Sequence, residues 1–284
     1  VAEGSGLTKI SLTGITAGAN EEQPLSVSVS STNSELLADL RVDYSSPASL
    51  GLLSLTPTEN KHGSSVITVT VTDGGQDNDL NTSADNKTAS VSFNYIVTEV
   101  NNQPTLDSLS DVNLSEDAAE QTVNLAGITA GPEESQNLRV TSLSSDTSLL
   151  LNPTVTYSSA DPTGTIKFTP VADQSGTATV TVTVEDAGLD NDFNTTTDNA
   201  SFSQSFVVTV AAVNDTPGAD VVADLAVNED AGEQTVALTG IHAGGGETQP
   251  LRVTAVSSDT DLLADPTIQY TSGEAAGTLK FTPV

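Results

Sequence analysis

The chain repeats itself at a fixed interval without insertion or deletion. The pentapeptide Gly-Ile-Thr-Ala-Gly begins at positions 14 and 127 and returns as Gly-Ile-His-Ala-Gly at position 240, a step of 113 residues each time. A fixed period longer than about 50 residues indicates an array of whole domains rather than a solenoid of single supersecondary units. We therefore expect three modules: residues 1–104, which lack the start of the first strand, a complete module at 105–217, and an incomplete module at 218–284.

Each module is predicted to be built of short strands. Residues 178–184 read Ala-Thr-Val-Thr-Val-Thr-Val, and period-two alternation of this kind places aliphatic side chains on one buried face and hydroxyl groups in water. Six further segments follow the same pattern, and clusters of Gly, Pro, Asn and Asp separate them; they are 109–114, 121–125, 138–143, 154–157, 165–168 and 203–210. Seven strands in about 110 residues predict an all-β fold of tandem antiparallel β-sandwiches of cadherin or immunoglobulin type.

Short proline-containing segments join the modules. Residues 100–104 read Val-Asn-Asn-Gln-Pro, and residues 213–217 read Val-Asn-Asp-Thr-Pro. Proline fixes its own backbone and biases the preceding residue towards an extended form. We therefore expect short, fairly stiff linkers that hold successive modules end to end.

The charge of the chain excludes several classes of partner. The chain carries 38 acidic and 8 basic residues, a formal net charge of −30, and no cysteine. Phosphate binding needs a basic surface, so nucleic acid and an anionic membrane surface are not expected partners. The sequence contains no apolar run long enough for direct membrane insertion. Without disulfides, each module must depend on its core, on metal ions or on both.

Acidic residues are densest in the loop before the last strand of the first two modules. There, Asp and Asn alternate in Asp77-x-Asp79-x-Asn81 and Asp190-x-Asp192-x-Asn194. Calcium takes six to eight oxygen ligands, which such a loop could supply; the alternative is that these side chains cap turns of an acidic hairpin. The candidate ligands in these loops are Asp73, Asp77, Asp79, Asn81, Asp85, Asp186, Asp190, Asp192, Asn194 and Asp198.

A second group of candidates lies near the linkers. It consists of Asn-Asp pairs or their variants after the last strand and Glu-Asp pairs near the first strand: Glu99, Asn101, Asn214, Asp215, Glu116, Asp117, Glu229 and Asp230. Asn-Asp-Thr-Pro at 214–217, Asn-Glu-Asp-Ala at 228–231 and Val-Glu-Asp-Ala-Gly at 184–188 are similar to cadherin calcium motifs. The whole repeat resembles the cadherin-like and immunoglobulin-like tandem repeats of giant bacterial surface proteins and adhesins.

This resemblance implies an extracellular protein at the bacterial cell surface, with calcium bound at module junctions. By position it implies ligands at Asp186, Asn214, Asp215, Glu116 and Glu229, with Asp73 and Glu3 as their equivalents. The first linker departs from the pattern because Asn102 replaces Asp215 and removes a charge, which Glu99 could restore. The first junction is therefore expected to bind fewer calcium ions or to bind them more weakly.

The favoured function is structural, a stalk segment stiffened by calcium and by contacts with neighbouring modules. Within the same class, edge strands rich in Thr and Val could pair with other copies of the chain in a fibre or surface layer. A module that binds carbohydrate or a receptor is the second alternative, although such sites usually display aromatic side chains and only 4% of the residues are aromatic. We expect no enzymatic activity, since His62 and His242 do not recur at equivalent positions and so could not activate a repeated nucleophile.

Overall fold

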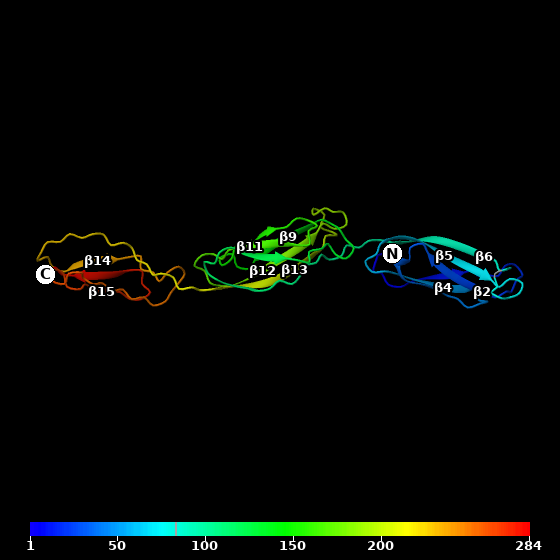
Figure 1. Cartoon of the computed structure of the whole chain (residues 1–284), viewed down its shortest axis with the longest axis horizontal. Coiled ribbons are helices and arrows are strands. Elements are labelled where there is room, and N and C mark those ends of the chain that lie inside the picture. The colour runs from blue at the N-terminus through cyan, green and yellow to red at the C-terminus, as the bar shows by residue number, and fades with distance from the viewer. Residues whose placement is uncertain (83) are drawn as a thin grey trace. The chain divides into compact units, whose positions relative to one another are not determined.

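A computed structural model describes residues 1–82 and 84–284, and the described residues are almost all in strands and loops (Figure 1). One 3-10 helix, Ser34–Leu36, is the only helix among them. The chain divides into two compact units. The first contains Val1–Pro104 with the loop segments Thr129–Leu138 and Asp186–Ala200, and the second contains the remaining residues.

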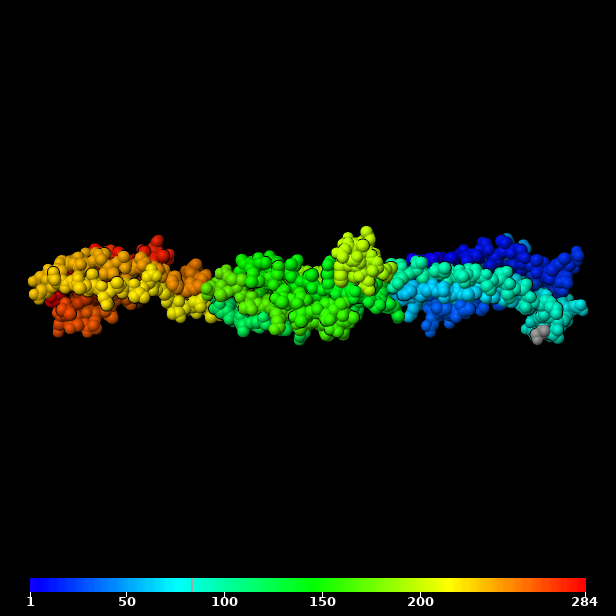
Figure 2. Space-filling model, turned by 90° about the horizontal axis from the view of Figure 1, so that it is seen from above, coloured from blue at the N-terminus to red at the C-terminus, as the bar shows by residue number. Residues whose placement is uncertain are grey.

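The first repeat forms two facing three-stranded sheets, in the orders β1-β4-β3 and β2-β5-β6, with antiparallel pairing throughout. Between the sheets lies a core that includes Leu53, Leu55, Ile67 and Tyr95, all of them buried. The strands of the first repeat are β1 (Thr8–Thr13), β2 (Leu25–Ser31), β3 (Leu37–Asp43), β4 (Leu50–Pro57), β5 (Gly63–Asp73) and β6 (Thr88–Val97). Figure 2 shows residues 88–97, coloured teal, at the surface of this repeat.

The second repeat has the seven strands that the alternation predicts. They form a four-stranded sheet, β7-β13-β12-β9, and a three-stranded sheet, β10-β11-β8. The strands are β7 (Val112–Ser115), β8 (Gln121–Leu125), β9 (Leu138–Ser144), β10 (Thr154–Thr156), β11 (Gly164–Phe168), β12 (Gly176–Asp186) and β13 (Ser201–Ala211). β11 pairs antiparallel with β8 and β10, and β12 with β13, whereas β7 runs parallel to β13, with Val112 opposite Val208.

The two faces of β12 show why alternation predicts this fold. Val180 and Val182 are fully buried between the sheets. The residue between them, Thr181, points outward and its hydroxyl lies 2.9 Å from that of Ser205 on β13. Aliphatic burial on one face and hydroxyl pairing across strands on the other stabilise the same register. The all-β sandwich expected from the sequence is confirmed.

The third repeat forms one sheet, β14-β16-β15, from Gln234–Leu238, Gly277–Phe281 and Thr267–Gln269. These strands are the counterparts of β8, β11 and β10 at the 113-residue step. No second sheet faces them within the described part of this repeat. Apolar side chains on the core side of this sheet are consequently less buried than in the second repeat: Leu279 is half-buried, whereas its counterpart Ile166 is fully buried.

Candidate metal centre

Three carboxylates from separate segments of the second unit meet beside the second linker. Asp117 lies in the turn after β7, Asp173 in the turn between β11 and β12, and Asp215 in the linker after β13. One oxygen of each lies within 4.8 Å of the other two. Asp117 and Asp215 are residues that the sequence predicted as ligands, whereas Asp173 was not predicted.

Two glutamates extend this acidic cluster, which we call the second-linker cluster. Glu116 is 5% exposed, and its Oε1 accepts a hydrogen bond of 2.6 Å from the N–H of Val213. Glu247, from a loop of the third repeat, accepts a hydrogen bond of 3.0 Å from the N–H of Asp215. Gly245 allows the close approach of Asp173, since a Cβ atom on this glycine would overlap the carboxylate. The second-linker cluster thus joins two repeats and the linker between them.

The cluster has a surplus of negative charge and of acceptor atoms. In the described part of the chain, neither a lysine nor a histidine pairs with any of its five acids. Oδ2 of Asp215 is buried without a hydrogen-bond partner. Burial raises the pKa of the Asp215 carboxyl above its ordinary value, and the charges of the other four acids raise it further. A buried, unpartnered carboxylate oxygen facing other carboxylates fits a hard cation such as calcium, which binds oxygen ligands.

The first linker has different chemistry at the equivalent positions. The counterparts of Asp117, Asp173 and Asp215, 113 residues earlier, are Gly4, Asn60 and Asn102, and none of them carries a charge. Two bases lie beside them. Lys61 forms an ion pair of 3.0 Å with Glu133, and His62 lies between the carboxylates of Glu3 (3.7 Å) and Glu99 (3.8 Å).

Amide side chains connect the first linker to loops of the second repeat. Asn101 Nδ2 donates to Oδ1 of Asp186 at 3.0 Å and to the carbonyl oxygen of Asp198 at 2.9 Å. The backbone and side-chain amides of Asn102 both donate to Oε1 of Glu134, at 2.8 and 3.1 Å. This network, which we call the first-linker network, is made of direct hydrogen bonds between protein groups.

Two acceptor atoms of the first-linker network remain unpaired. Asp186 is fully buried; its Oδ1 accepts from the N–H groups of Gly188 and Ala200, while its Oδ2 has no partner. Oε2 of Glu134 is likewise buried without a partner, and burial raises the pKa of this carboxyl. The first linker could therefore also hold a cation at the unpaired oxygens of these two carboxylates.

The hairpin-loop candidates are connected mainly to one another. Asp77 accepts from the N–H of Asp79 (3.0 Å) and from the hydroxyl of Thr82 (2.6 Å), and Asp79 accepts from the N–H and the side-chain amide of Asn81. The hydroxyl of Thr82 and the N–H of Asp79 lower the pKa of Asp77. Asp73 and Asp85 also accept backbone hydrogen bonds in this loop.

The corresponding loop of the second repeat has the same bonds. Asp190 accepts from Asp192 N–H and from the hydroxyl of Thr195, Asp192 accepts twice from Asn194, and Asp198 accepts from the N–H of Leu189. The loops thus have the hydrogen bonds expected of the turn-capping alternative. Calcium binding by these loops stays a prediction.

The remaining candidates near the linkers lie as follows. Asn214 Oδ1 accepts from Gln249 at 3.0 Å, which places it next to the second-linker cluster because Gln249 also donates to Glu247. Glu229 and Asp230 are exposed in a turn of the third repeat and belong to no cluster of three acids among the described residues. Asp173, Glu247 and Glu134 are the acids that sequence reasoning missed.

No family model matches the chain, and no curated protein matches it. Solved structures give weak likenesses. Domains 4 and 5 of the S-layer protein SbsC are 19% identical, over 71% of this chain and 75% of that one, with a TM-score of 0.28. The human desmocollin-1 ectodomain is 15% identical over 91% of this chain and 46% of that one, with a TM-score of 0.32.

An endo-fucoidan hydrolase of glycoside hydrolase family 107 is also similar, with 15% identity over 96% of this chain and 39% of that one and a TM-score of 0.29. At these identities and TM-scores the likenesses carry no information on function. The fold assignment rests on the strand order and register of the sheets themselves. In the described residues, no helix has the length and apolar character needed to cross a membrane.

Proposed function

We propose that the chain is a structural segment of an extracellular bacterial surface protein, in which calcium stiffens the linkers between β-sandwich modules. The observation that carries this proposal is the second-linker cluster, where Asp117, Asp173 and Asp215 face one another beside Glu247 of the next repeat. The cadherin-like sequence motifs at the linkers and the acidic composition support the same reading.

The proposed mechanism is charge neutralisation at the linker. Without a cation, the carboxylates of two neighbouring repeats repel each other and favour conformations that separate them. A calcium ion would be held by Asp117, Asp173 and Asp215, and the negative charges of Glu116 and Glu247 beside Asp215 would add to the attraction. Because Asp117 and Asp173 belong to the second repeat, and Glu247 of the third repeat holds the N–H of Asp215 in the linker, binding would restrict the angle between repeats.

The test is small-angle scattering and thermal melting of the whole chain, with calcium and with chelator. We expect calcium to lengthen and stiffen the particle and to raise the melting temperature, since a ligand that binds only the folded state stabilises it. Asp173→Asn should reduce both responses. Asp224→Asn removes the same charge from an exposed residue outside the cluster and should leave them unchanged. Identical scattering and melting of the wild-type chain in both conditions would exclude the mechanism.

A further inference from the structure

A histidine and two glutamates of the first repeat lie close together beside the first linker. β5 pairs antiparallel with β6, so His62, directly before β5, lies next to Glu99, which follows β6. The N–H of Glu3 donates to the carbonyl oxygen of Thr98 at 2.9 Å, which brings a third segment to the same place. As a result, Nδ1 of His62 lies 3.7 Å from Oε2 of Glu3, and its Nε2 lies 3.8 Å from Oε2 of Glu99.

One carboxylate oxygen of this group is buried and unpaired. The side chain of Glu3 is 6% exposed. Its Oε1 accepts a hydrogen bond of 3.2 Å from the N–H of Val100, whereas its Oε2, at 3.7 Å from His62, has no hydrogen-bond partner. A separation of 3.7 Å is too long for a hydrogen bond. A buried carboxylate oxygen without a partner costs free energy, which a cation between it and the imidazole would offset.

The separation of the two atoms suits two ligands of one metal ion. Zinc binds histidine nitrogen and carboxylate oxygen at about 2.0–2.2 Å with tetrahedral geometry, which places two ligand atoms about 3.3–3.6 Å apart. The side chain of His62 is 41% exposed and has room to move by the small difference. Its other nitrogen faces Glu99, and metal-bound histidines usually donate their second N–H to a carboxylate, which fixes the ring. Water would fill the remaining coordination positions.

The second repeat does not have this arrangement. The residues 113 positions after His62 and Glu99 are Ser175 and Ala212, so the equivalent place has neither a nitrogen ligand nor a carboxylate to orient it. The second-linker cluster is built of carboxylates instead. Imidazole nitrogen suits zinc and other transition-metal ions, whereas a set of carboxylates suits calcium. The two linkers therefore differ in the kind of ion that their side chains favour.

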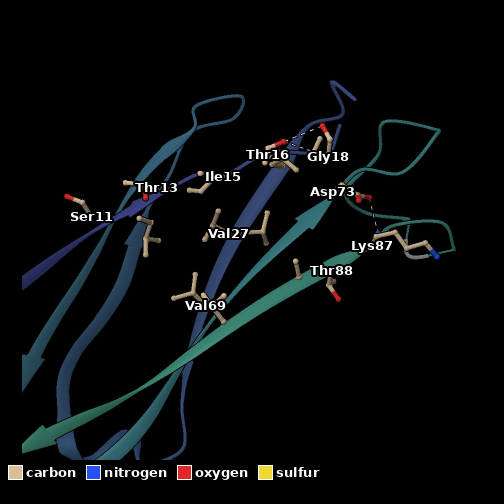
Figure 3. A pocket seen from close by; sticks show the side chains of 17 residues that line it. Ser11, Thr13, Ile15, Thr16, Gly18, Val27, Val69, Asp73, Lys87 and Thr88 are labelled. Carbon is tan, nitrogen blue, oxygen red and sulfur yellow. Dashed lines mark hydrogen bonds between the residues drawn. The ribbon is translucent and has the colours of Figure 1, made fainter. Parts of the chain in front are cut away.

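The opposite end of β5 has a carboxylate in a different setting. There Oδ1 of Asp73 accepts hydrogen bonds from the N–H groups of Lys87 (2.9 Å) and Gly75 (3.0 Å), and Figure 3 shows the bond from Lys87. The groove of about 570 Å³ beside Asp73 has aliphatic walls that include Val27 and Val69, and no histidine is among the described residues that line it. Of the two ends of β5, only the end at His62 places an imidazole against a buried, unpaired oxygen.

We propose that His62 and Glu3 bind a zinc ion beside the first linker and that Glu99 orients the imidazole. The ion would tie the segment before β1 to the segment before β5, next to the end of β6 from which the first linker leaves. It would therefore stabilise the start of that linker. The inference does not depend on calcium at the second-linker cluster.

The chain has only two histidines, so the imidazole nitrogens can be observed one by one. The measurement is NMR of these nitrogens in the whole chain, titrated with zinc chloride in excess calcium, which fills sites that prefer carboxylates. The Nδ1 signal of His62 should shift and saturate at one equivalent of zinc, while the signals of His242, an exposed residue of the third repeat, stay in place. Equal shifts of both histidines, or no shift of His62, would overturn the proposal.

Calorimetric titration of variants with zinc separates the roles of the three residues. Glu99→Gln should weaken zinc binding about tenfold, as loss of a carboxylate behind a metal-bound histidine does. His62→Gln and Glu3→Gln should weaken it more, and His242→Gln should leave it unchanged. Glu3→Gln keeps an oxygen that can accept from the N–H of Val100, so its melting temperature in chelator should match that of the wild-type chain. Wild-type zinc affinity in His62→Gln would overturn the proposal. The scattering response to calcium should persist in His62→Gln, so this proposal and the calcium mechanism fail independently.

Discussion

The backbone N–H of Asp215 donates to Oε2 of Glu247 at 3.0 Å, which joins the second linker to a loop of the third repeat. This hydrogen bond also brings two carboxylates together, next to Asp117 and Asp173. The linker contact therefore contains a favourable bond and a like-charge repulsion at the same place. Whether the hydrogen bond or the repulsion between carboxylates dominates should depend on whether a cation is bound.

Asp215→Asn should have opposite effects with and without calcium. In chelator, the variant removes a like charge from the cluster and should raise the melting temperature of the chain. In excess calcium, it removes a ligand and should lower the melting temperature below that of the wild-type chain. Calorimetry in calcium and in chelator measures both changes in melting temperature. Asp224→Asn is the control for the change in net charge. A change of the same sign in both conditions would contradict the role of Asp215 as a ligand.

The effect of Asp215→Asn in chelator should disappear in acid. The pKa of Asp215 is raised in the folded chain, so the folded state binds this proton more tightly than the unfolded state does. Its ionisation therefore destabilises the folded chain at neutral pH, and the destabilisation is relieved as the pH falls through the raised pKa. Melting of the wild-type and variant chains at several pH values should show a difference that is largest near neutrality. A difference in melting temperature between the two chains that grows on acidification would contradict this prediction.

Calcium should fill the second linker at a lower concentration than the first. The second-linker cluster contains five carboxylates, whereas the first linker has uncharged residues at three equivalent positions, and calcium affinity rises with the number of charged ligands. Hydrogen exchange of the peptides that span 211–217 and 98–104, followed through a calcium titration, measures the two linkers in one chain. Simultaneous protection of both peptides would contradict this order.

A direct ion pair should make the first linker less dependent on calcium. Lys61 pairs with Glu133 at 3.0 Å, and no lysine occupies the equivalent place near the second linker. Lys61→Gln should therefore increase hydrogen exchange of residues 98–104 in chelator and leave residues 211–217 unchanged. Because the pair is partly exposed, the increase should shrink at high salt. An equal increase at both linkers would point to a general loss of stability instead.

The strands could be predicted from the sequence, whereas the linker site could be predicted only in part. Alternation along β12 sets both its register and its buried face, so the strand could be predicted from local pattern alone. Asp173 could not be predicted in this way. It lies 56 residues from Asp117, and only the folded turn brings its N–H to 3.4 Å from the Asp117 carboxylate. The parallel pairing of β7 with β13 likewise depends on tertiary topology, which alternation does not encode.

Equivalent core residues of the second and third repeats should contribute differently to the free energy of unfolding. Ile166 is fully buried between the two sheets of the second repeat, whereas its counterpart Leu279 is half-buried because no second sheet faces it in the part of the chain that the structure describes. Ile166→Ala should destabilise the second repeat by about 2–5 kcal/mol, since it leaves a cavity in a close-packed core. Leu279→Ala should cost less, and Leu143→Ala, at a 62% exposed position, should change the free energy of unfolding by about 0.5 kcal/mol or less.

Native-state hydrogen exchange on the whole chain separates these three effects, because it reports the opening free energy of each strand. The loss from Ile166→Ala should appear in β8, β10 and β11, which share the sheet around this residue. Equal losses from Ile166→Ala and Leu279→Ala would contradict the role of the facing sheet in this difference.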